Sequence, residues 1–198
     1  ENAGIQPEIA TKMAELSYDQ TKIDEGKALL AQTKQVYVKN KTEDVETTEA
    51  SNLFKTNRKL LEDTFRKHRK RAQVVFRNDP VMLKKLHIDD GVPGAYPKLI
   101  ETTRLFYTEA AKTDVTDKLA RLGITAEDIA AGSELVGTVE TNRVDYLREV
   151  GESEDATQEK DAAMATMQDW MSEFYAVARI ALEDSPQLLE ALSKPVKS

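Results

Sequence analysis

Two histidines and a few paired carboxylates are the residues of this chain whose types could support metal chemistry. A di-iron site in a helical bundle requires Glu-x-x-His on two helices, with carboxylates from two others. Phe65 lies three residues before His68, and Lys84 lies three residues before His87, so neither motif exists. The chain contains no cysteine, which excludes disulfides, thiolate metal sites and a cysteine nucleophile. We therefore expect no metal ligand.

Patterns typical of other catalytic sites are also missing from the sequence. Asp89-Asp90-Gly91 lies in a predicted turn and lacks the alternating acids and final Glu of a calcium loop. Glu127 and Asp128 fit the preference of acidic residues for the first turn of a helix. No glycine-rich phosphate loop, Gly-x-Ser-x-Gly elbow or His-Glu-x-x-His motif occurs. The sequence thus predicts a protein that is not an enzyme, with no catalytic residue and no cofactor.

A basic run is the most visible charge feature. From Lys55 to Arg71 the chain has eight Lys and Arg residues against Glu62 and Asp63. Such a run can contact the phosphates of nucleic acid or an anionic surface. The whole chain carries a net charge of −7, so a solvated helix face is the favoured interpretation, with His68 as a surface residue. The candidates for interaction are Arg66, Lys67, Arg69, Lys70 and Arg71.

Large apolar side chains cluster near the carboxyl end. Trp170, Phe174 and Tyr175 lie among Met167 and Met171 at helical spacing. Packing in a core is the favoured interpretation, and the alternatives are an exposed patch for association or a cavity for an apolar ligand. Trp170, Phe174 and Tyr175 are therefore further candidates for interaction.

Composition favours long helices as the elements that carry these residues. The chain has 198 residues, of which 40% are hydrophobic and 32% charged, with only 8 Gly and 6 Pro. This composition is too apolar for a disordered chain, and it has too few turn-forming residues for a many-stranded sheet. No segment approaches the roughly 18 consecutive apolar residues of a membrane span. The first residues show no signal-peptide pattern, so a cytoplasmic location is expected.

Apolar spacing predicts four long helices with a chain reversal inside each half. The first is predicted to bury Leu30 and Tyr37, and the second to bury Leu53 and Leu60. Their predicted ranges are about 7–41, 47–77, 125–150 and 157–184, with reversals at 41–44 and 151–156. Thr125-Ala-Glu-Asp128 has the spacing of a capping box. Shorter helices are expected near 80–86, 97–122 and 186–192.

A sequence pattern recurs at an interval of 106 residues. Ala72–Leu86 aligns with Ala178–Leu192, and in each stretch a long helix ends before a proline that opens a short one. The predicted fold is all-α: an elongated four-helix bundle of two antiparallel helical hairpins with an internal pseudo-two-fold repeat. The repeat halves span about 7–86 and 125–192, joined by a helical segment over 87–124, in a single domain over 1–198.

Part of the chain carries a family resemblance. The stretches concerned are Leu86–Gly91, Leu122–Thr125, Thr157–Asp161, Trp170–Asp184 and Pro186–Leu192. They resemble a family of uncharacterised bacterial all-helical proteins of unknown function, over about residues 72–192. The resemblance implies a helical bundle without assigned chemistry and carries over no catalytic residue. The chain departs from the pattern at Ser193, where glycine is expected.

The distribution of charge bears on the expected partners. Residues 1–99 carry 18 Lys and Arg against 15 Asp and Glu, whereas residues 100–198 carry 10 against 20. Opposite charges could attract within one fold or across a dimer. We expect a structural or protein-interaction module that forms a homodimer or binds another protein. The alternative is a ligand-binding bundle that uses the 87–97 loop and the Trp170 cluster, and nucleic-acid binding through residues 55–71 is weaker still.

Overall fold

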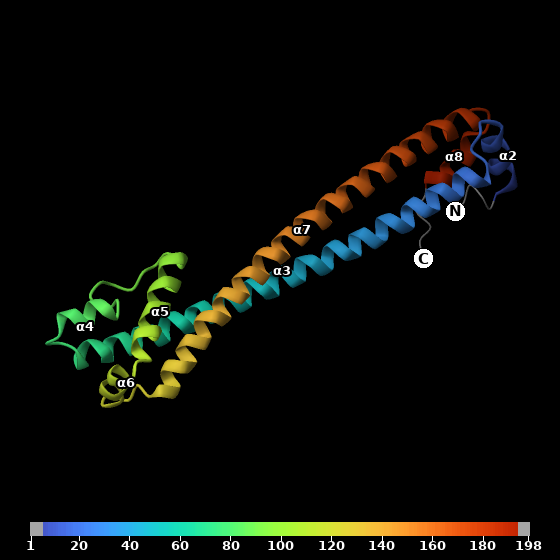
Figure 1. Ribbon diagram of the computed structural model, residues 1–198. Helices are drawn as coiled ribbons and strands as arrows, with labels where there is room; N and C mark the ends of the chain where they lie inside the picture. The colour runs from blue at the N-terminus through green and yellow to red at the C-terminus, as the bar shows by residue number, and fades with distance from the viewer. Residues whose placement is uncertain (1–5, 194–198) are drawn as a thin grey trace. The chain divides into compact units, whose positions relative to one another are not determined.

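Helices dominate this computed structural model, which describes residues 6–193 except the side chains of Pro186, Ala191 and Ser193 (Figure 1). The residues first considered for a signal peptide therefore lie mostly outside the described part. The helices are α2 (Pro7–Glu15), α3 (Gln20–Val75), α4 (Pro80–Lys85), α5 (Tyr96–Ala110), α6 (Thr113–Ala120), α7 (Ala126–Ala181) and α8 (Pro186–Ser193). Because the described residues include no strand, the all-α prediction is confirmed.

Both long helices run through the points where reversals were predicted. α3 and α7 have 56 residues each, and the polar stretches 41–44 and 151–156 lie inside them. The four separate long helices, and the hairpins built from them, are therefore wrong. Polar residues are compatible with the exposed face of a helix, and an exposed Gly151 costs a helix only about 1 kcal/mol. The break that does occur, between Glu15 and Gln20, was not predicted.

The chain divides into two compact units that share the long helices. We call residues 1–44 with 152–198 the terminal unit, and residues 45–151 the central unit. The terminal unit contains α2, α8, the start of α3 and the end of α7. The central unit contains α4, α5, α6, the end of α3 and the start of α7. A single domain over 1–198 stays a prediction.

Each unit has its own apolar core. In the central unit, α3 contributes Leu61 and Phe65, and α5 contributes Phe106, all with no exposed surface. In the terminal unit, Met13 of α2 and Leu182, the residue after the end of α7, are almost fully buried in a second cluster. Burying one large apolar side chain stabilises a fold by about 1.5–3 kcal/mol, so these clusters hold the short helices against the long ones.

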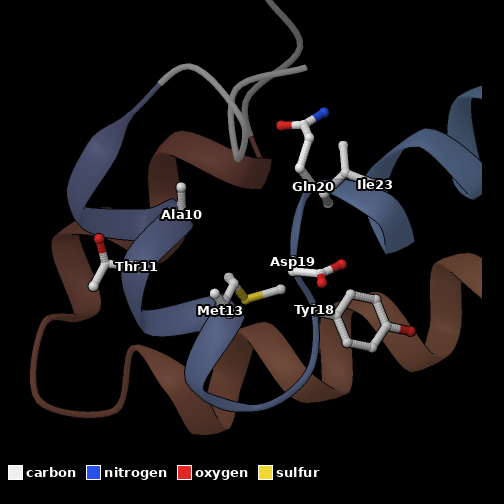
Figure 2. Close-up of a pocket in the computed structure, with 8 residues that line it drawn as sticks. Ala10, Thr11, Met13, Tyr18, Asp19, Gln20 and Ile23 are labelled. Atoms are coloured by element: carbon white, nitrogen blue, oxygen red, sulfur yellow. The ribbon is translucent and has the colours of Figure 1, made fainter.

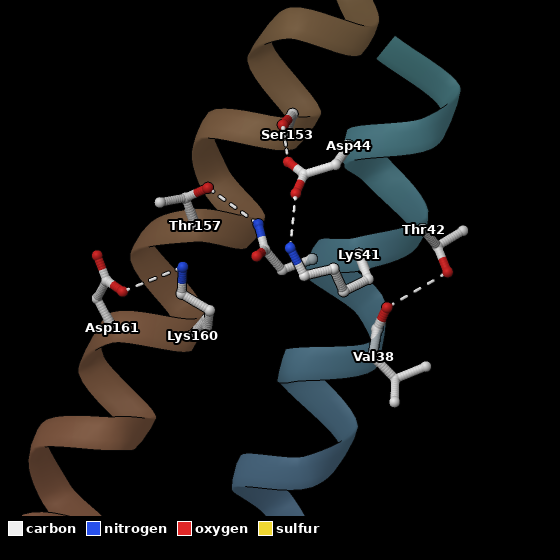
Figure 3. A network of polar contacts seen from close by, with 9 residues as sticks. Val38, Lys41, Thr42, Asp44, Ser153, Thr157, Lys160 and Asp161 are labelled. Atoms are coloured by element: carbon white, nitrogen blue, oxygen red, sulfur yellow. Dashed lines mark hydrogen bonds and ion pairs between the residues drawn. The ribbon is translucent and has the colours of Figure 1, made fainter. Parts of the chain in front are cut away.

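Polar contacts accompany the antiparallel pairing of α3 and α7 within the terminal unit (Figure 3). Asn40 is 3% exposed, and its Nδ2 donates to Thr157 Oγ1 over 3.0 Å. Thr33 Oγ1 donates to the Leu29 carbonyl of its own helix over 2.8 Å and also lies 3.4 Å from the Ala163 carbonyl of α7. A buried asparagine restricts the register of paired helices, because only one alignment gives it a hydrogen-bonding partner.

The helix bounds recur at the interval found in the sequence. α2, α3 and α4 begin 106 positions before α6, α7 and α8, respectively. The turn after α2 and the turn after α6 share a left-handed residue, Ser17 with φ 64° and Gly123 with φ 70°. The amides of Tyr18 and Ile124 each donate to the carbonyl five residues earlier, over 3.0 and 3.3 Å. The two turns therefore have the same local geometry.

The first turns of α3 and α7 are capped at corresponding positions. Asp19 Oδ1 accepts from the Lys22 amide over 3.1 Å at the start of α3. Thr125 Oγ1 accepts from the Asp128 amide over 3.2 Å, and Asp128 Oδ2 accepts from the Thr125 amide over 2.9 Å. The capping box predicted at Thr125 is confirmed.

Candidate functional site

Two arginines of the basic run, Arg58 and Arg69, donate hydrogen bonds to the loop that precedes α5. Arg58 Nη2 donates to the Gly94 carbonyl over 2.8 Å, and Arg69 Nη2 donates to the Ile88 carbonyl over 3.2 Å. Arg69 also donates to the Asp90 carbonyl. These hydrogen bonds join the loop to α3, so Arg58 and Arg69 have a structural role. The sequence offered no signal for this contact because the loop is distant along the chain.

The other four basic candidates are two arginines with acceptors away from this loop and two exposed lysines. Arg71 Nη1 donates to the Gly123 carbonyl over 2.9 Å, at the left-handed turn before α7. Arg66 forms an ion pair with Glu62 over 2.5 Å, one turn earlier on the same helix. Lys67 and Lys70 are exposed. Of the five basic candidates, three thus have acceptors within the central unit, which favours the structural interpretation over phosphate binding.

His68 lies inside the basic run but points into the core of the central unit. Its side chain is 8% exposed, so the prediction of a surface histidine is wrong. Nδ1 lies 3.1 Å from the Tyr107 hydroxyl, and the two rings meet edge to face with centroids 5.9 Å apart. Burial lowers the pKa of His68, while the Asp128 carboxylate acts in the opposite direction. Burial also raises the pKa of Tyr107, so a neutral pair is favoured.

A glycine makes room for the tyrosine of this pair. A Cβ on Gly132 would lie 2.2 Å from the Tyr107 ring. In the terminal unit a Cβ on Gly26 would lie 2.4 Å from the Trp170 ring. Gly26 and Gly132 are 106 positions apart, so each unit packs one large aromatic ring onto the backbone of the same helical position.

The Trp170 cluster belongs to the terminal unit. Trp170 stacks on Phe174 with centroids 5.4 Å apart and ring planes 11° from parallel, and Tyr175 meets Phe174 edge to face. Phe174 is 8% exposed and part of the core, whereas Trp170 and Tyr175 are half-buried. Trp170 Nε1 is buried and has no hydrogen-bond acceptor among the described residues. The prediction of core packing therefore holds for Phe174, whereas part of the Trp170 side chain is exposed to solvent.

The ligand-binding alternative combined the 87–97 loop with the Trp170 cluster, but the loop lies in the central unit and the cluster in the terminal unit. A depression of about 440 Å³ borders the loop of the central unit, where His87, Asp89 and Lys98 contribute to its lining. The terminal unit has a pocket of about 290 Å³ between α2 and the start of α3, bordered by Met13 and Tyr18 (Figure 2). Trp170 does not line this pocket. Each depression is therefore a separate candidate.

Several large apolar side chains that were predicted to be buried are exposed. In the central unit, α3 exposes Leu53 by 52% and Leu60 by 51%. In the terminal unit, α3 exposes Leu30 by 42% and Tyr37 by 47%. Neighbours such as Leu60 and Leu61 point about 100° apart on a helix, and here Leu61 faces the core while Leu60 is exposed.

Among the described residues, no helix is long and apolar enough to cross a membrane. Comparisons of the chain with protein-family models, curated proteins and solved structures found no match, so the family resemblance stays a prediction.

Proposed function

We propose that this chain is a non-catalytic helical interaction module that forms a homodimer through the outer face of α3 in the central unit. The observation that carries this proposal is a stripe of half-exposed apolar side chains on that face. Its members are Val45, Leu53, Leu60 and Val74, exposed by 49–56%. They recur at steps of seven, eight and fourteen residues, which returns to the same side of a helix. The core residues Leu61 and Phe65 point the other way.

Charge on the same face suits an antiparallel pairing of two copies. Glu46 lies seven residues before Leu53, and Lys67 lies seven residues after Leu60. Both side chains are exposed. An antiparallel pair centred between the two leucines brings Leu53 against Leu60 of the second copy. The same alignment brings Glu46 against Lys67 of the second copy. The stripe extends over about 40 Å at 1.5 Å per residue, a length suited to a stable interface.

Native mass spectrometry tests this proposal, because it reads subunit number and retained small molecules together. We expect a mass of two chains for the wild type and of one chain for the double variant Leu53→Glu with Leu60→Glu. Val81→Glu is the matched control, since Val81 is 64% exposed but lies on α4, and it should stay dimeric. Glu46→Lys should weaken the dimer, and adding Lys67→Glu should restore it. A monomeric wild type, or a dimer that survives the double variant, contradicts the proposal.

Ligand binding is the second candidate, supported by the depression beside the loop of the central unit. A reproducible extra mass in the same spectra, lost on exchange of Lys98 in the first turn of α5 for Ala, would favour it. Nucleic-acid binding remains the weakest alternative because Arg58, Arg69 and Arg71 already donate to carbonyls of the protein.

We further propose that the chain contains two copies of one helical arrangement, as the recurrence in sequence indicates. The equal interval between the starts of α2, α3, α4 and of α6, α7, α8 supports this. The matched turns at Ser17 and Gly123 support it independently. On this view α5 and its loop are an addition between the copies.

A further inference from the structure

In the central unit, α5 covers a face formed jointly by α3 and α7. Phe106 of α5 meets Phe65 of α3 edge to face at 5.3 Å. Tyr96 of α5 lies 5.6 Å from Phe54 of α3, between ring centroids, and Arg143 of α7 lies 4.3 Å from the Tyr96 centroid. Leu61, Phe65, Val136 and Val139 belong to the same apolar cluster as Phe106 and are nearly or fully buried.

The terminal unit has the corresponding face, and none of its own described helices takes the place of α5 in the 106-residue correspondence. Leu61 and Phe65 of α3 correspond to Met167 and Met171 of α7, which lie 106 positions later. Val136, Glu140 and Arg143 of α7 correspond to Leu30, Lys34 and Tyr37 of α3, which lie 106 positions earlier. Val136 is 3% exposed, whereas Leu30 is 42% exposed. Leu61 and Phe65 have no exposed surface, whereas Met167 and Met171 are half-buried.

We define the open face by its members Leu30, Lys34 and Tyr37 of α3 with Met164, Met167 and Met171 of α7. Tyr37 is 47% exposed and Met164 is 49% exposed. Three of the five methionines of the chain lie here. Methionine adapts its shape to different partners and is frequent on surfaces that bind helices.

We infer that the open face is the docking site for an amphipathic α-helix of a partner protein, which would lie there as α5 lies on the central unit. Contacts of α5 indicate the chemistry of that helix. Arg104 of α5 pairs with Glu140, and the position equivalent to Glu140 is Lys34. The partner helix therefore presents an acidic residue where α5 has Arg104.

The packing of aromatic rings adds a second requirement. Tyr107 of α5 fills the space above Gly132, but the space above Gly26 already holds Trp170 of the unit itself. A docking helix therefore has a small residue at the position of Tyr107 and apolar residues toward the methionines. This inference does not depend on the proposed homodimer, which uses other residues of α3.

A synthetic peptide tests the open face directly. The peptide has the sequence of residues 95–111 with Arg104→Glu and Tyr107→Ala, and it contains no tryptophan. Trp170 is the only tryptophan of the chain, so its fluorescence reports binding to the full-length protein. We expect a saturable change in fluorescence. The peptide with the unchanged sequence should bind at least about tenfold more weakly, because it places Arg104 against Lys34 and brings Tyr107 into the space that Trp170 fills.

Variants of the chain assign the effect to the open face. Leu30→Asp should abolish the saturable change, whereas Val38→Asp, at a position 63% exposed on the same helix, should leave it unaltered. Lys34→Glu should shift the preference toward peptides that keep Arg104. Far-UV circular dichroism confirms that each variant folds.

Three results would overturn the inference. The first is the absence of a saturable change with either peptide, and the second is a change that survives Leu30→Asp. The third is self-association that Leu30→Asp abolishes, which would identify a second copy as the occupant. Failure of the homodimer proposal would appear separately, in the Leu53 and Leu60 variants.

Discussion

At the scale of single residues, the buried pair of His68 and Tyr107 is the most constrained feature of the central unit. The neutral ring can accept at Nδ1 from the tyrosine hydroxyl, with its proton on Nε2, or donate from Nδ1 to the hydroxyl oxygen. Arg71 and Lys67 of α3 oppose a positive charge on this ring, and Asp128 of α7 favours it. Protonation would place a charge on a largely buried ring, which costs desolvation free energy.

We predict that stability falls on acidification because of His68. Its pKa is lowered in the folded chain, whereas the unfolded chain has the ordinary value of about 6.5. The unfolded chain therefore takes up the proton first. The contribution of His68 is complete above about pH 6.5 and is lost as the pH falls, by at most about 1.4 kcal/mol per pH unit.

Chemical denaturation between pH 7 and pH 5 measures this effect. The matched variant is His68→Phe with Tyr107→Phe, which places at position 68 the residue found at the equivalent Phe174. Its stability should change less over this range than that of the wild type. Equal slopes for the two proteins would show that His68 does not carry the dependence.

The two ring-packed glycines allow a second prediction. Gly132→Ala and Gly26→Ala would each place a Cβ within 2.4 Å of an aromatic ring. We expect each to destabilise its unit by about 1–3 kcal/mol, although alanine favours a helix by about 1 kcal/mol over glycine. Gly137→Ala is the control, because nothing lies within 4 Å of the added Cβ, and it should raise the melting temperature. If all three variants gained stability, the ring placement would be wrong.

At the scale of elements, the pairing of α3 with α7 depends on polar as well as apolar contacts. In the terminal unit Asn40 and Thr157 satisfy each other across the pair. In the central unit Asn57 Nδ2 donates to Asn142 Oδ1 over 2.7 Å. Such contacts contribute little net stability, but they penalise a shifted register because the buried groups would lose their partners.

Thr157→Val tests this view of the terminal unit. It leaves the buried Asn40 amide without its acceptor and should lower the free energy of unfolding by about 1–3 kcal/mol. The double variant Asn40→Leu with Thr157→Val removes both polar groups and should recover most of the loss. A double variant no more stable than the single one would contradict a coupled pair. Denaturant unfolding gives the three values.

Local signals in the sequence predicted helix starts well and the course of the long helices poorly. Asp79 before Pro80 and the Thr125 box define starts through contacts within four residues, and both occur. The stretch 41–44 has the polar composition of a loop, yet it continues α3 because nothing there forbids helical geometry. The burial of His68 could not be predicted, since Tyr107 comes from an element 39 residues away.

At the scale of the whole molecule, the long helices carry exposed apolar side chains in both units. The stripe on α3 of the central unit and the open face of the terminal unit differ in position and in expected partner. The first is proposed to pair with a second copy, and the second to receive a helix of another protein. Exposed apolar faces of this kind are typical of surfaces that bind proteins.

Hydroxyl-radical footprinting of the wild-type protein at low and high concentration tests the homodimer most directly. Oxidation is read by mass spectrometry at Leu53, Leu60 and Val74, with Val81 and Val144 as references because both are more than 60% exposed. We expect the three stripe residues to become protected as concentration rises, while both reference residues react at a constant rate. Stripe residues that react equally at every concentration would contradict the proposed homodimer.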